Sequence, residues 1–313
     1  MIIGGSSRPG DHRPGPTASP SATEEVDLLA RVASFTAPFR PGTGYRPPTG
    51  RQRHTVARAV GLLLDGEQTR ARRLLDGVDL TLTPLSDRTT GRRYLELSDR
   101  TEHAPAPRGW GRVYLPVGTP ARWSVQVPHP VSDRDSERLG VRVLRGSPGG
   151  VLVLAGAHRD AGRGDTADMA HRRDTVFDAV VAELTARRLP GIQLHGFAQD
   201  SAPRYDAIAS TGAGRTARPE GRELADALRG RGLDVCRAWV RDCPLEGRSN
   251  VQGRRAAAHQ VPFLHLELAP QQRTRPQRAD RVAAAISEVT SRWAHAAAPS
   301  PSSSGSGSPT GQT

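Results

Sequence analysis

The chain has 313 residues, of which 36% are hydrophobic, 24% charged and only 4% aromatic, and its formal net charge is +12. These proportions are typical of one or two soluble globular domains with a core built mainly from Val, Leu and Ala. No apolar run approaches the ~18 residues of a membrane span, and residues 1–20 lack the apolar segment of a signal peptide. We therefore expect no membrane partner and a soluble chain, cytoplasmic as written and secreted if the start site is misplaced.

The positive charge comes entirely from arginine, because the sequence contains no lysine. A strongly basic chain can indicate a nucleic-acid partner. Here the arginines are spread along the chain instead of forming a stripe with aromatic residues. A complete lack of lysine is also typical of a bias toward GC-rich codons. Nucleic-acid binding is therefore only a minor alternative.

The two ends of the chain are rich in Pro, Ser and Gly and hold little that could be buried. Residues 1–24 and 297–313 are predicted to be disordered tails. Residues 24–35 are predicted to form a short apolar helix, and the Pro- and Gly-rich residues 39–50 are predicted to be a connector.

Residues 25–120 are predicted to form a small α+β region. Apolar residues recur at spacings of three and four between residues 52 and 75, which predicts a helical hairpin. Residues 78–118 alternate apolar with polar positions and predict a small antiparallel meander. The part from residue 52 to 120 could be a subdomain or the edge of the main domain.

Strands alternate with helices over residues 121–296, which predicts an α/β domain with a mixed sheet flanked by helices. Ligands of such sheets bind at the carboxyl ends of the strands. The predicted strands are 123–129, 151–156, 191–196, 207–211, 233–240 and 263–268. The predicted helices begin at Asp133 or span 174–188, 222–232 and 279–297, and the stretch before the last strand is predicted to be a Gly/Asn loop.

Cys236 and Cys243 are too few and too widely spaced for a zinc ribbon or a thioredoxin-type pair. A local disulfide and two free buried thiols are equally compatible with the sequence. A disulfide would favour an oxidising compartment.

Four apolar strands carry, at or near their carboxyl ends, a residue suited to metal or proton chemistry: His129, His158, His195 and Glu267. Asp133 follows His129 by one helical turn, so an imidazole and a carboxylate can converge on one ion. Together with His195 they make a two-His, one-carboxylate zinc site with a position left for water.

Glu267 lies inside an otherwise apolar strand, where a buried carboxylate is costly unless it is paired or coordinated. We interpret it as the general base beside the zinc site. Asn250 and Arg254, in a Gly-rich loop, could hold a substrate carboxylate, and Arg273 just past the Glu267 strand could do the same.

These assignments have structural alternatives. A single histidine in an apolar strand is more often a packing residue than a ligand, Asp133 could be a helix N-cap, and Arg254 could be an ordinary surface arginine. His265 shares a strand face with Glu267, so it lies either beside the site or in the core.

Three further polar residues follow the strand that ends near residue 156. They are His158, Asp168 and His171, and they are candidates for orienting a metal ligand or contacting the substrate.

The order of these motifs over residues 123–275 resembles that of poly-gamma-glutamate hydrolases, zinc-dependent peptidases whose fold is similar to that of carboxypeptidases. That family shows a strand-end His with a nearby acid, a strand ending in His-Gly, an Asn...Arg loop, and a QLEL strand followed by arginine. The corresponding residues here are His129 with Asp133, His195 with Gly196, Asn250 with Arg254, and HLEL at 265–268 with Arg273. N-formylglutamate amidohydrolases show a similar succession.

The resemblance implies a zinc amidohydrolase in which His129, Asp133 and His195 bind the ion. It also implies that Glu267 activates the water and that arginine recognises an acidic substrate.

The first motif departs from the family pattern, because HPVSD replaces His-Gly-Gly and the acid is displaced. Asp135 or Glu137 could therefore replace Asp133. His158 could also be the first ligand, with Asp165 or Asp168 as its partner.

We therefore expect a soluble, monomeric zinc amidohydrolase that cleaves an amide next to a carboxylate, in an acidic peptide-like or small-molecule substrate. The alternatives are a deformylase of the N-formylglutamate type, a catalytically silent binding protein and an arginine-rich nucleic-acid binder.

Overall fold

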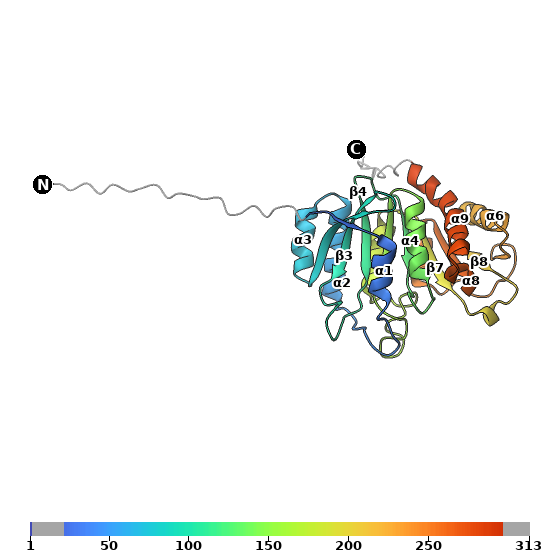
Figure 1. Cartoon of the computed structure of the whole chain (residues 1–313), viewed down its shortest axis with the longest axis horizontal. Helices are drawn as coiled ribbons and strands as arrows, with labels where there is room; N and C mark the ends of the chain where they lie inside the picture. The colour runs from blue at the N-terminus through green and yellow to red at the C-terminus, as the bar shows by residue number, and fades with distance from the viewer. Residues whose placement is uncertain (2–21, 297–313) are drawn as a thin grey trace, which may run out of the picture.

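The computed structural model describes Met1 and residues 22–296 (Figure 1). The two predicted tails lie almost entirely outside these residues. No helix in the described part is long and apolar enough to cross a membrane.

The described residues form one ten-stranded sheet, in the order β1-β2-β3-β4-β6-β5-β7-β10-β8-β9. The strands are β1 (Glu24–Val26), β2 (Leu80–Asp87), β3 (Arg93–Asp99), β4 (Arg112–Val117), β5 (Trp123–Val127), β6 (Gly150–Leu154), β7 (Gly191–Gly196), β8 (Ala207–Ser210), β9 (Val235–Arg237) and β10 (Phe263–Leu268). The central strands β6, β5, β7 and β10 are parallel, whereas β2, β3, β4 and β8 make antiparallel pairs. The predicted α/β class with a mixed sheet is confirmed.

Helices cover both faces of this sheet (Figure 1). The first face is covered by α1 (Leu28–Thr36), α4 (Ser136–Gly146), α6 (Arg218–Gly230) and α9 (Pro276–His295). The second face is covered by α2 (Gly50–Leu64), α3 (Gln68–Asp76), α5 (Val176–Ala186) and α7 (Val251–Ala258). The short α8 (Pro270–Thr274) precedes α9, and a 3-10 turn, η1, spans Gln199–Ser201.

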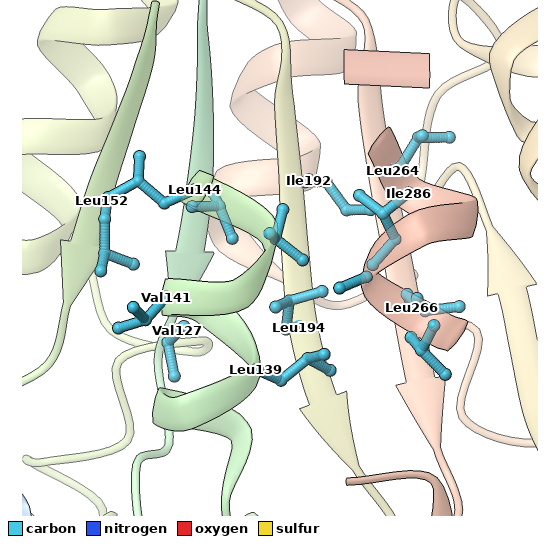
Figure 2. Close-up of a cluster of buried hydrophobic side chains, with 14 of the residues drawn as sticks. Val127, Leu139, Val141, Leu144, Leu152, Ile192, Leu194, Leu264, Leu266 and Ile286 are labelled. Atoms are coloured by element: carbon cyan, nitrogen blue, oxygen red, sulfur yellow. The ribbon is translucent and has the colours of Figure 1, made fainter. Parts of the chain in front are cut away.

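The first face is purely apolar at its centre. Figure 2 shows Leu194 of β7 and Leu266 of β10 beside Leu139 of α4 and Ile286 of α9, and all four side chains are fully buried. These leucines alternate with polar residues along their strands, so the hydrophobic period of two decides which face receives them.

The second face carries two buried rows of polar side chains across the central strands. Gln126, Gln193 and His265 are neighbours in the register of β5, β7 and β10, and His195 is paired with Glu267 one step further along. All five side chains are buried. Buried polar groups are costly unless they are bonded, so these rows mark the part of the sheet where function is to be sought.

The meander predicted over residues 78–118 is the run β2, β3 and β4, and β4 pairs with β6. The meander therefore continues the sheet beyond β6.

Three details differ from the prediction. β1 lies where the start of a helix was expected, and α7 occupies part of the predicted loop. The sequence of α7 contains Gly253 and a run of alanines, so it has no hydrophobic period that would reveal a helix. β9 ends at Arg237 because the chain turns and brings Cys243 back to Cys236, and these two cysteines form a disulfide.

Candidate active site

A cavity of about 370 Å³ opens at the carboxyl ends of β5, β7 and β10. Its walls include His129, Asp133, His195, His265 and Glu267. The parallel arrangement of the three strands brings these residues together, because parallel strands end at the same edge of the sheet.

Of the three candidate acids in the first motif, Asp133 is the one that lines the cavity. It lies in the turn between β5 and α4, where Val131 and Asp135 adopt left-handed backbone conformations with φ of 68° and 62°. Such a φ is a strained conformation for a β-branched residue. Glu137 braces this turn by accepting a hydrogen bond from the Val131 N–H at 3.1 Å, and Asp135 precedes α4. Neither Asp135 nor Glu137 lines the cavity.

Three side-chain atoms that could hold a metal ion lie within 4.8 Å of one another. His129 Nδ1 lies 3.4 Å from Asp133 Oδ2, and His195 Nδ1 lies 3.6 Å from the same oxygen. Two ligands ~2.0–2.2 Å from a tetrahedral zinc ion are ~3.3–3.6 Å apart. His129 Nδ1 and Asp133 Oδ2 are buried, with no hydrogen-bond partner among the described residues. The donor set therefore fits a cation between the three side chains.

Both imidazoles are oriented by acceptors on their other nitrogen. His129 Nε2 donates to Asp168 Oδ1 at 2.7 Å, and His195 Nε2 donates to Gln193 Oε1 at 2.7 Å. When the ring is neutral, as a metal ligand has to be, each Nδ1 carries the lone pair and faces the cavity, which is the arrangement typical of metal-binding histidines.

Asp168 is the centre of a charged cluster at the cavity wall. Arg159 Nη2 donates to Asp168 Oδ2 at 2.8 Å, and His171 Nδ1 lies 3.0 Å from the same oxygen. Burial opposes ionisation of both Asp168 and His129. The hydrogen bonds of Asp168 with His129 and His171 outweigh burial and lower the pKa of Asp168, and Asp133 and Asp168 together raise the pKa of His129 to about 9.

Glu267 lies beside His195, on the neighbouring strand. Its Oε2 is buried with no hydrogen-bond partner among the described residues. Burial and the nearby Asp133 carboxylate raise the pKa of Glu267 to about 8. A cation held by Asp133 would offset the second cause and favour the carboxylate form.

His265 is beside the site, the first of its two predicted positions. Its ring stacks on that of His195 with centroids 4.5 Å apart, and its Nε2 lies 3.9 Å from Glu267 Oε1. Burial holds the pKa of His265 well below its usual range, so the ring is neutral.

The residues predicted to bind substrate are placed differently. Asn250 touches the cavity, but its Oδ1 caps α7 by accepting the Gly253 N–H at 2.8 Å, and its Nδ2 donates to Gln193. Arg254 is exposed, donates to the Arg248 carbonyl oxygen and does not line the cavity.

Arg273 is buried and does not line the cavity either. Its guanidinium donates to the carbonyl oxygens of Leu268, Phe197 and Arg134 and so ties the ends of β10 and β7 to the turn that carries Asp133. A Cβ on Gly196 would lie 2.2 Å from Arg273 Cζ, which explains the glycine after His195. The structure thus corrects the predicted substrate role, since the donors are used by the backbone.

The two loop histidines, His158 and His171, differ in their position relative to the cavity. His171 lines the cavity, whereas His158 does not and instead accepts the Asp160 N–H at 3.2 Å. Asp165 is exposed and pairs with Arg172. The alternative site built on His158 is therefore not assembled.

Two important residues were missed from the sequence. Arg159 follows His158 directly, and in an arginine-rich chain nothing distinguishes it. Gln193 had a readable signal, because it is a polar residue two positions before His195 in an apolar strand and must share its face.

No protein-family model matches the sequence, and no curated protein matches it either. Among solved structures, N-formylglutamate amidohydrolase from Ralstonia eutropha is similar over 58% of this chain and 96% of that one, with 15% identity and a TM-score of 0.40. A metallo-carboxypeptidase from Pseudomonas aeruginosa is similar over 72% and 68%, with 11% identity and a TM-score of 0.37. Succinylglutamate desuccinylase from Chromobacterium violaceum is similar over 67% and 69%, with 16% identity and a TM-score of 0.39.

These similar structures are of the kinds that the sequence motifs resemble, an amidohydrolase and a metallo-carboxypeptidase, together with a desuccinylase. Likenesses with TM-scores of 0.40 and below carry no argument about activity. The function has to be argued from the geometry of the site.

Proposed function

We propose that this chain is a zinc-dependent hydrolase of an amide bond next to a carboxylate. One observation carries the proposal. His129 Nδ1, His195 Nδ1 and Asp133 Oδ2 lie close together, and the Nε2 of each histidine is hydrogen-bonded to an acceptor, so Nδ1 is the nitrogen left for a metal.

A zinc ion there would polarise an amide carbonyl and lower the pKa of a water molecule bound to it. The two imidazoles and one carboxylate are the ligand types that zinc prefers, and three protein ligands leave a position open for catalysis.

Glu267 serves as the general base in this proposal. Its Oε2 is the buried, unpartnered atom that can take a proton from the attacking water and return it to the leaving nitrogen. The apolar strand around it raises its proton affinity toward the value that proton transfer near neutral pH requires.

Arg159 brings a cationic guanidinium to the cavity wall and His171 lies beside it, so we assign these two residues the substrate carboxylate. Arg159 uses Nη2 on Asp168, and its guanidinium has further N–H donors for an acidic ligand. This contact replaces the one expected from Arg254 and Arg273. A poly-gamma-glutamate end and an N-formylated or N-acylated acidic amino acid both present the required amide and carboxylate.

Zinc content tests the site first. Wild-type protein should hold about one zinc ion per chain by inductively coupled plasma mass spectrometry. His129→Ala and His195→Ala should lose it, and the control His158→Ala should keep it. Wild-type protein that stays free of metal after zinc reconstitution would overturn the proposal.

Hydrolysis tests the activity second. The zinc-loaded protein should cleave at least one of N-formylglutamate, N-succinylglutamate and gamma-linked glutamate oligomers, and a chelator should abolish the cleavage. A zinc-loaded protein that cleaves no acidic amide would instead be a catalytically silent binding protein.

A further inference from the structure

The amide of Gln193 is bonded at both ends within the buried polar face of the sheet. Its Oε1 accepts from His195 Nε2 at 2.7 Å and from Asn250 Nδ2. Its Nε2 donates to Gln126 Oε1 at 3.1 Å and to Gln252 Oε1 at 3.3 Å. All of these side chains are at most 5% exposed, so water cannot substitute for a missing partner.

The orientation of this amide is imposed from α7. Gln252 Nε2 donates to Asp178 Oδ1 at 3.0 Å and to the Met169 carbonyl oxygen at 2.9 Å. The Asp178 carboxylate and the Met169 carbonyl can only accept, so Gln252 must turn its Nε2 toward them and its Oε1 toward Gln193. Gln193 must then turn its Nε2 toward the Oε1 of Gln252.

One further contact imposes the same orientation. Asn250 Oδ1 accepts the Gly253 N–H, so its Nδ2 has to face the oxygen of Gln193. On the other side, Gln126 Nε2 donates to Ser124 Oγ at 3.1 Å. A hydroxyl can donate as well as accept, so Gln126 follows the orientation of Gln193 and does not set it.

His195 has a competing arrangement that this network opposes. Its Nδ1 lies 3.6 Å from Asp133 Oδ2. A proton on Nδ1 would be attracted to that carboxylate and would block the lone pair that faces the cavity. With the oxygen of Gln193 fixed against Nε2, the proton stays on Nε2.

We propose that Gln193 is a positioning residue that selects the Nε2–H tautomer of His195, and that α7 sets the orientation of Gln193 through Gln252 and Asn250. The importance of this tautomer for zinc rests on the proposed function, but the tautomer itself does not. The Nε2 of His129 is bonded to the carboxylate of Asp168, whereas His195 uses an uncharged acceptor that adds no negative charge to the site.

The test uses full-length protein with ring-15N histidine, read by two-dimensional NMR without metal, and zinc affinity by competition with a chromogenic chelator. In the wild-type protein, Nδ1 of His195 should be unprotonated and Nε2 should carry the proton. Gln193→Met should shift the proton toward Nδ1 and weaken zinc binding ~10–100-fold, the usual cost of losing such a partner.

Gln126→Met is the matched control. It removes a buried amide from the adjacent strand but leaves the contact with Gln252, so tautomer and affinity should stay within ~3-fold of wild type. Gln193→Glu should rescue the tautomer because it restores an acceptor.

Gln252→Met gives a second measurement if Gln193→Met does not fold. It removes the main orienting contact and should produce a mixture of His195 tautomers. If His195 keeps its wild-type tautomer in both Gln193→Met and Gln252→Met, this inference is overturned, and the proposed zinc site is unaffected. Absence of zinc binding by wild type would overturn the proposed function, and the tautomer spectra would still decide the role of Gln193.

Discussion

His129 and His195 occupy one wall of the cavity, and their partners give them different charge states. Asp133 and Asp168 outweigh the effect of burial and raise the pKa of His129 to about 9, whereas burial lowers the pKa of His195. At the residue scale the site is therefore divided into a charged part around Asp168 and a neutral part around His195. Glu267 lies beside the neutral part, where its carboxyl group is poorly hydrated and holds its proton more tightly.

Glu267→Gln keeps the size of the side chain and removes its ability to take a proton. We expect kcat to fall ~10²–10⁴-fold, the usual contribution of a general base, with zinc content unchanged. Steady-state kinetics on the cleaved amide measures the effect. The exposed Glu288, which pairs with Arg231, provides the control Glu288→Gln, which should retain wild-type kcat. If Glu267→Gln keeps full activity, Glu267 is not the general base.

Arg159→Gln tests recognition of the substrate carboxylate. Loss of the guanidinium should raise KM ~10-fold or more, because hydrogen bonds to a charged group contribute about 1.5–3 kcal/mol. Arg254→Gln alters an exposed arginine outside the cavity and should leave KM unchanged. The reverse result would restore the substrate role first predicted for Arg254.

At the scale of elements, β2 is tied to α4 by a buried ion pair next to the start of α1. Asp87 is fully buried and accepts from Arg145 Nη2 at 2.8 Å, from Thr90 Oγ1 at 2.9 Å and from the Leu28 N–H at 3.3 Å. One carboxylate thus joins a strand, a turn and two helices. Burial alone would raise the pKa of Asp87, but the hydrogen bonds from Arg145 and Thr90 outweigh burial and lower it.

Asp87→Asn should therefore destabilise the fold in a pH-dependent manner. Because the folded-state pKa of Asp87 lies below the ordinary pKa of about 3.9 for an aspartate, the stabilisation is present above pH ~5 and is lost as the pH falls through the folded-state pKa. We expect a cost of ~3 kcal/mol at pH 7 that shrinks toward pH 3.

Urea unfolding between pH 7 and pH 3 measures this cost. The control Asp280→Asn breaks an exposed pair with Arg142 and should change stability by less than ~0.5 kcal/mol. A cost for Asp87→Asn that stays constant down to pH 3 would contradict the argument.

At the scale of the whole molecule, the N-terminal region and the α/β part share one core. Val60 of α2 and Val113 of β4 lie in the same buried cluster as Val153 of β6 and Val180 of α5. The sheet is also continuous from β4 to β6. A boundary near residue 120 therefore does not coincide with a gap in packing.

Residues 121–296 expressed alone should not fold, because β6 and α5 would expose valines that α2 and β4 now cover. The intact chain should instead unfold in one urea transition that coincides by circular dichroism and tryptophan fluorescence. A folded 121–296 fragment that binds zinc would show that residues 25–120 form a separate domain.

Features that depend on local pattern could be predicted from the amino-acid sequence. Alternation in strands and spacing in helices predicted most elements and the mixed α/β sheet, because these periods are set by backbone geometry. Polar residues at the ends of apolar strands predicted which side chains would meet, and the structure brings His129, Asp133, His195 and Glu267 into one cavity.

Hydrogen bonds between residues far apart in the chain depend on the tertiary structure. Asn250 and Gln193 are separated by 57 positions, and Arg273 reaches Arg134 across 139. No local pattern shows that the donor groups of Asn250 and Arg273 are already hydrogen-bonded within the fold. For this reason the sequence pattern suggested that they bind substrate. The position of Arg159 at the cavity likewise depends on how the loops pack at the edge of the sheet. The sequence contains no lysine, so nothing in the side chain itself distinguishes Arg159 from the other arginines.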